Sequence, residues 1–176
     1  MKKINVRIES VRPMLMNEFQ PEEGTTKKGQ VYEPNDECVK RLIKDSDDNI
    51  CAKSSWIEGA LVSSGAEFKF KGHKTYKTIL QAGIYVDPDL IVLSNQDWEI
   101  DSRRVKIQRA SIMRSRPIFR EWSLDFDIVI TSPDLIQPAI LKEILENAGK
   151  VKGIGDYRPK YGLFKVTKFE EEDNGA

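Results

Sequence analysis

Alternating apolar and polar residues predict the first strand of the chain. In residues 3–11, Ile4, Val6 and Ile8 are each followed by a polar residue, and this period of two is typical of a strand with one buried face. Residues 103–116 are rich in β-branched side chains and precede a second alternating run, so we predict a long hairpin that turns near residues 114–117. Six apolar residues share one face of that second run: Ile118, Trp122, Leu124, Phe126, Ile128 and Ile130.

Two segments carry the signals of helices. Residues 54–65 open with Ser55 and Glu58, which have the spacing of a capping box, and end at Gly65. Residues 138–149 begin with Pro138, contain four apolar residues at helical spacing and end at Gly149. Proline is common in the first turn of a helix and glycine at its C-terminal end. An apolar segment at residues 161–169 predicts the last strand.

In chain order these elements are strand, helix, strand, strand, helix, strand. This order predicts an α+β protein with the β-α-β-β-α-β antiparallel sheet of the ferredoxin-like, or RRM-like, fold. Residues 18–53 and 66–100 would be insertions in a single domain covering residues 1–176, and the acidic tail at 170–176 is expected to fray. Two helices on one face of such a sheet leave the other face open, and RRM-type proteins bind RNA on that face.

Composition narrows the function only slightly. The 28 Lys and Arg residues balance 28 Asp and Glu residues, so the distribution of charge is informative and its total is not. The two cysteines, Cys38 and Cys51, have neither metal-type spacing nor enough companions for a disulfide framework. We therefore expect a reducing, cytoplasmic location. No apolar stretch approaches the ~20 residues needed to cross a bilayer, so we expect no membrane partner.

Positive charge gathers in two places. A first cluster lies between residues 103 and 120 without any acidic residue among its members, and consists of Arg103, Arg104, Lys106, Arg109, Arg114, Arg116 and Arg120. A second cluster is interleaved with aromatic residues and contains Lys69, Lys71 and Lys74. Cations near aromatic rings suit a groove that neutralises phosphates and stacks bases. The alternative is a solvated face of the hairpin that binds nothing.

The stretch "AGKVKGIGDYRPKYGLFKV", residues 148–166, is a glycine-rich loop between a helix and a strand. Gly153, Gly155 and Gly162 permit positive φ and close backbone approach. Exposed amides beside Arg158 and Lys160 would form an anion-binding concavity. Phosphate loops of nucleotide hydrolases precede a helix, so this one does not fit them. A tight structural turn is the alternative reading.

Signals for catalysis are weak. His73 is the only histidine and has no nucleophile motif around it. Asp97, Glu99 and Asp101 alternate on one strand face and could hold Mg²⁺, although pairing with arginines is the favoured reading. We therefore expect no metal site and no cofactor.

The loop and the strand after it resemble the C-terminal glycine-rich loop and last strand of the RAMP superfamily, the ferredoxin-like proteins of CRISPR effector complexes and crRNA processing. "INVRIESVRPMLMN" resembles the family's first strand and turn. "SSWIEGAL" resembles the start of its first helix, with Ser54, Ser55 and Trp56 at matching positions. The resemblance covers residues 1–17, 54–65 and 102–169, and is greatest to the backbone-type subunits that polymerise along guide RNA.

This resemblance implies sequence-tolerant binding of single-stranded RNA, or of single-stranded DNA, by a homo-oligomer or a larger ribonucleoprotein complex. Backbone subunits are usually longer, with larger insertions than this chain has. Processing nucleases of the superfamily commonly use a histidine. One alternative function is therefore a metal-independent endoribonuclease that uses His73, although His73 lies outside the matching motifs. A second alternative is an interaction protein whose basic hairpin docks on another protein.

Overall fold

The computed structural model describes residues 1–19 and 32–172, so the segment 20–31 of the first expected insertion and residues 173–176 of the acidic tail lie outside the described residues. The main sheet has the order β4-β8-β1-β9 and every neighbouring pair in it is antiparallel. Its strands are β1 (Lys2–Ser10), β4 (Ile84–Asp87), β8 (Ser123–Ile130) and β9 (Phe164–Glu171).

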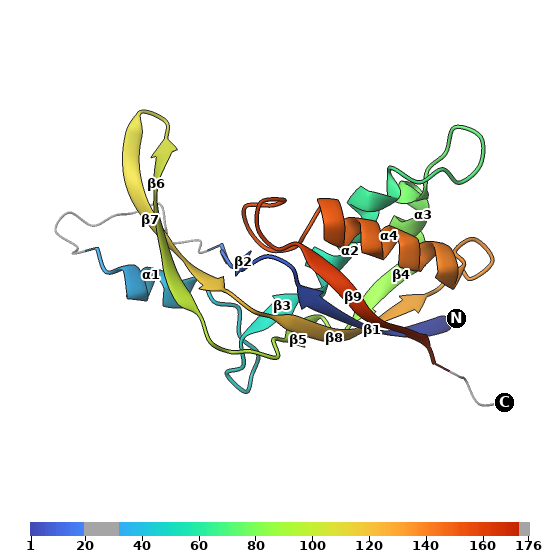
Figure 1. Ribbon diagram of the computed structural model, residues 1–176, viewed down its shortest axis with the longest axis horizontal. Coiled ribbons are helices and arrows are strands. Elements are labelled where there is room, and N and C mark those ends of the chain that lie inside the picture. The colour runs from blue at the N-terminus through green and yellow to red at the C-terminus, as the bar shows by residue number, and fades with distance from the viewer. Residues whose placement is uncertain (20–31, 173–176) are drawn as a thin grey trace.

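Three helices lie on one side of this sheet (Figure 1). They are α2 (Ser54–Gly65), α3 (Tyr76–Gly83) and α4 (Pro138–Val151). The alternation predicted for β1 is confirmed, because Ile4, Val6 and Ile8 are almost completely buried in the core beneath the helices. Each such side chain contributes roughly 1.5–3 kcal/mol through burial. The arrangement is consistent with the predicted ferredoxin-like fold.

The start of α2 differs from the prediction. No side chain caps its first turn, so the capping box expected from Ser55 and Glu58 is wrong. The carboxylate of Glu58 instead accepts a hydrogen bond from the backbone amide of Val86 at 2.9 Å. Val86 belongs to β4, which lies at an edge of the main sheet, so Glu58 covers an amide that would otherwise be open to another strand.

The predicted end of α4 is also wrong. The helix continues through Gly149 to Val151 because Gly149 serves packing: a Cβ on it would lie 2.3 Å from the carbonyl oxygen of Phe164 in β9. Lys152 is the C-cap, and the chain turns away from the helix at Gly153, which has a φ of +72°. The amides of Lys152 and Gly153 both donate to the carbonyl of Ala148 at 2.9 Å, which satisfies the last turn.

A second sheet leaves the body of the molecule (Figure 1). It has the order β2-β7-β6, with β2 (Met14–Leu15), β6 (Glu99–Ile107) and β7 (Ala110–Phe119). The helix α1 (Pro34–Lys40) packs against β7, and a small pair forms between β3 (Cys51–Lys53) and β5 (Leu90–Val92). In the part of the chain that the structure describes, no helix is long and apolar enough to cross a membrane.

The predicted hairpin exists, but its turn was wrongly placed near residues 114–117. Arg103 pairs with Arg114 and Ile107 with Ala110, so the turn lies at residues 108–109. The apolar run 118–130 is divided between β7 and β8, and the chain changes sheet at residues 120–122. The strand beside β8 at one edge of the main sheet is β4, which takes the place predicted for residues 103–116, because those residues pair within the hairpin instead.

Candidate nucleic-acid interface

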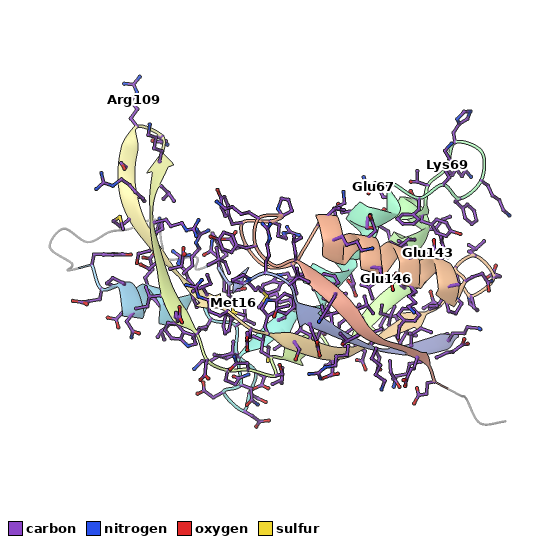
Figure 2. All side chains as sticks on the ribbon, in the orientation of Figure 1. Met16, Glu67, Lys69, Arg109, Glu143 and Glu146 are labelled. Atoms are coloured by element: carbon purple, nitrogen blue, oxygen red, sulfur yellow. The ribbon has the colours of Figure 1, made fainter. Side chains whose placement is uncertain are left out.

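The β6–β7 hairpin carries six of the seven cations of the first basic cluster, and Arg120 directly follows β7. Side chains alternate across a strand, and the cross-strand register places Arg103, Arg114 and Arg116 on one face. Arg104 and Lys106 point from the opposite face. Arg109 stands in the turn, where Figure 2 shows it at the projecting tip of the hairpin. The cluster that is continuous in sequence is therefore divided in space.

Four of its seven cations are paired with carboxylates. The sequence places no acid between residues 103 and 120, but the fold brings acids in from outside that segment, so the expected excess of positive charge is smaller than the sequence indicated. Asp101 and Glu99 lie earlier on β6 and pair with Arg103 and Arg120, which confirms that these two acids pair with arginines. The pairs are Arg103–Asp101 at 2.7 Å, Arg114–Glu37 at 3.3 Å, Arg116–Asp156 at 2.7 Å and Arg120–Glu99 at 3.0 Å.

Arg104, Lys106 and Arg109 have no acidic partner among residues 1–19 and 32–172. All three side chains are exposed. Arg104 and Lys106 lie on the last part of β6 before the turn, and Arg109 lies at the tip of the hairpin, away from the main sheet (Figure 2). Their charge is therefore available to an external anion.

Glu37 of α1 holds the base of the hairpin. Its carboxylate accepts hydrogen bonds from the Ser115 amide at 2.9 Å, from Arg41 at 2.9 Å and from Arg114 at 3.3 Å. Burial by itself would raise the pKa of Glu37, but these hydrogen bonds and one with Tyr32 outweigh it and hold the pKa below its usual value. The charged form of Glu37 therefore fixes α1 against β7.

The glycine-rich loop is packed against the rest of the chain. The amides of Gly153, Ile154 and Gly162 donate to backbone carbonyls at 2.8–3.0 Å, and the amide of Asp156 donates to Leu15 at 2.8 Å. A Cβ on Gly162 would lie 1.7 Å from the carbonyl oxygen of Ile154. The concavity of free amides predicted from Gly153 and Gly155 is thus largely filled by internal hydrogen bonds. The exposed groups of the loop are side chains, Arg158 and Lys160 among them.

Two tyrosines join this loop to the hairpin, and sequence reasoning missed both. The guanidinium of Arg103 lies 4.9 Å from the centre of the Tyr161 ring and also donates a hydrogen bond to the Tyr161 hydroxyl. The guanidinium of Arg116 lies 5.9 Å from the centre of the Tyr157 ring. Hydrogen bonds to Asp101 and then Tyr161 raise the pKa of Arg103. The pattern Tyr-Arg-Pro-Lys-Tyr was the available signal, because it alternates aromatic and cationic residues.

The second basic cluster is not brought to the first. Lys69, Lys71 and Lys74 lie in an exposed loop between α2 and α3, and Figure 2 shows Lys69 at the opposite end of the molecule from Arg109. The ammonium group of Lys71 lies 5.3 Å from the centre of the Phe70 ring. Phe70 in turn packs edge-on against Tyr76. The two clusters cannot form one continuous groove within a single chain.

No catalytic constellation forms among the described residues. His73 is exposed in the same loop as Lys69, and no described side chain orients its ring. Burial raises the pKa of the Cys38 thiol to about 11, which keeps it protonated and unreactive near neutral pH. Within the described ranges no three His, Cys, Asp or Glu residues gather as a metal site would require.

The open face of the main sheet does not resemble an RNA-binding platform. Ion pairs cover it, with Lys3 bound to Asp127 at 3.0 Å and Arg7 bound to Asp125. RRM-type binding depends on exposed aromatic rings in the centre of the sheet, and the central strands β1 and β8 present carboxylates there instead. This face presents ion pairs in place of stacking rings, which leaves the hairpin and the loop as the candidate interface.

Comparisons with known proteins support the fold. No protein-family model matches the chain, and no curated protein matches it. Among solved structures it is similar to a chain of the type III-B Cmr-β complex bound to cognate target RNA, determined by cryo-EM, with a TM-score of 0.57 and 13% sequence identity. The match covers 97% of this chain and 60% of that one. The similarity is one of fold, and it is consistent with the RAMP-like fold that the sequence predicts.

Proposed function

We propose that the chain binds single-stranded nucleic acid, RNA in preference to DNA, without cleaving it. The observation that carries this proposal is the distal part of the β6–β7 hairpin, where Arg104, Lys106 and Arg109 are exposed and have no acidic partner among the described residues. Phosphate neutralisation by such cations is independent of sequence. The likeness in fold to a chain from an RNA-bound complex supports the choice of ligand.

Binding should depend strongly on salt. Each neutralised phosphate contributes a slope of about −0.7 to the logarithm of affinity against the logarithm of salt concentration for single strands. Three contacts therefore contribute about −2, which amounts to about 20-fold in affinity over a fourfold rise in salt. Replacing Arg104, Lys106 and Arg109 together by Gln should remove this part of the slope.

Fluorescence anisotropy with labelled single-stranded RNA and DNA, measured at several salt concentrations, tests the proposal. The matched control replaces Lys142 and Lys150, which are exposed on α4, by Gln. We expect wild-type slopes for the control and a reduced slope for the hairpin variant. Absence of RNA binding by the wild type at low salt would refute the proposal and would favour a protein partner for the hairpin.

We further propose that copies of the chain assemble along the nucleic acid in a CRISPR-like or mobile-element ribonucleoprotein. The support is the RAMP resemblance together with the fold shared with a chain from a multi-subunit complex. Size-exclusion chromatography with RNAs of increasing length should give complexes whose mass rises in steps with RNA length. A single 1:1 complex at all lengths would contradict assembly but not binding.

A further inference from the structure

The junction between the glycine-rich loop and the hairpin exposes an aromatic ring among cations. We propose that Tyr157 is a stacking site for one unpaired nucleobase, an inference that rests on the proposed function. Tyr157 is 51% exposed. Its ring packs against Tyr161, with 5.7 Å between the ring centres.

The charges around the ring favour a nucleotide over other planar ligands. Arg103 lies 5.7 Å, Arg116 5.9 Å and Lys160 5.9 Å from the centre of the Tyr157 ring. Arg103 and Arg116 are held by carboxylates, but Lys160 has no acidic partner in the described part of the chain and remains exposed. A base can stack on the ring while Lys160 neutralises a flanking phosphate.

Tyr157 and Tyr161 have different roles. The Tyr161 hydroxyl accepts a hydrogen bond from Arg103 and its side chain is partly buried, so it supports the junction. The Tyr157 hydroxyl has no hydrogen-bond partner among residues 1–19 and 32–172. The ring contacts Tyr161 and its neighbouring cations, but half of Tyr157 and its hydroxyl remain open to a ligand.

The backbone at Tyr157 is also unfavourable for a tyrosine. Its φ is +55°, whereas the other positive-φ positions of the loop are Gly153, Gly155 and Gly162. A side chain in the left-handed region strains the backbone, and such strain persists at sites where function requires a particular residue. Glycine would adopt this backbone conformation without strain, so a tyrosine here carries a backbone cost.

Space for the ligand lies next to the ring. A shallow groove of about 560 Å³ runs between the start of the loop and α2, lined by Ala60, Lys152, Tyr157 and Arg158 among others. Arg158 is exposed and adds a second cation without an acidic partner in the described residues. The groove can admit the sugar and phosphate that flank a stacked base.

The test compares RNA that carries bases with RNA of the same length that is abasic throughout, using anisotropy at constant salt. Base stacking on one aromatic side chain corresponds to a loss of about 5- to 150-fold when that side chain is removed. We expect Tyr157→Ala to lose this much affinity for RNA with bases, Tyr157→Phe to bind as the wild type does, and all three proteins to bind abasic RNA equally. Because stacking adds no charge, the salt slope should not change.

Tyr157→Gly separates binding from folding. Glycine relieves the positive φ, which offsets the lost ring contacts, so this variant should stay folded while losing affinity as Tyr157→Ala does. Wild-type affinity of Tyr157→Ala for RNA with bases would overturn the stacking site and leave the proposed function standing. If the wild type binds neither RNA, both proposals fail together.

Discussion

Two helical glycines should respond in opposite directions to the same substitution. Gly59 lies in the exposed middle of α2, and nothing lies within 4 Å of the Cβ that an alanine would add. Gly149 lies in α4, where that Cβ would meet the carbonyl oxygen of Phe164 at 2.3 Å and the Phe164 ring at 2.8 Å. The pair therefore isolates the contact between α4 and β9.

The magnitudes follow from this geometry. Alanine is more favourable than glycine in a helix by roughly 0.5–1 kcal/mol, and Gly59→Ala should gain that amount. Gly149→Ala gains the same helix propensity but forces a backbone carbonyl away, and overpacking of this kind costs about 1–3 kcal/mol. Because the obstacle is backbone rather than a flexible side-chain end, we expect a net loss of about 1–2 kcal/mol, or about 2–8 °C in Tm.

Urea denaturation of the wild type and both variants measures the effect. The midpoints should move in opposite directions while the m-values stay equal. The loop of residues 153–162 connects α4 to β9, so Gly149→Ala should also weaken RNA binding, whereas Gly59→Ala should not. A Gly149→Ala protein as stable as the wild type would refute the close packing of α4 against β9.

Two other expectations concern the hairpin base and the only histidine. Glu37→Gln should lower the free energy of unfolding by about 1.5–3 kcal/mol, because several charge-assisted hydrogen bonds meet at this carboxylate. Since the folded pKa of Glu37 is depressed below 4.5, its stabilisation is present above that pH and is lost as the pH falls through the folded pKa. Unfolding measured against pH should therefore show acid sensitivity in the wild type and less of it in Glu37→Gln. Equal acid sensitivity of the two proteins would contradict this role of Glu37. His73→Ala should leave labelled hairpin RNA as intact as the wild type does, and cleavage by the wild type alone would restore the endoribonuclease alternative.

The central strands of the main sheet were predictable because each is long and alternates regularly. Ile4, Val6 and Ile8 define β1 without help from the rest of the chain. The edge strand β4 was missed because it has only four residues, with Ile84 and Val86 as its buried positions. Two buried residues in alternation are a weak strand signal, so the longer segment rich in β-branched residues that follows was assigned to the edge of the sheet instead.

The hairpin turn was misplaced because its sequence lacks the usual turn residues. Gln108 adopts the left-handed conformation, with a φ of 56°, at a position where glycine or asparagine would have marked the turn. The ion pairs of Arg114 and Arg116 were not predictable either, since Glu37 and Asp156 are distant in sequence. What the sequence did indicate was the location of the basic residues, but not which of them remain available.

The length of the β6–β7 hairpin has a consequence for how such a protein can diverge. Beyond the Arg103–Arg114 pair the two strands are joined mainly to each other, so residues can be added or removed there without altering the main sheet. A change of two residues in each strand keeps every remaining side chain on its own face and moves the tip by roughly 7 Å. The distance from the sheet to the tip can therefore vary among descendants of this chain in regular increments, while the fold that carries the hairpin stays the same.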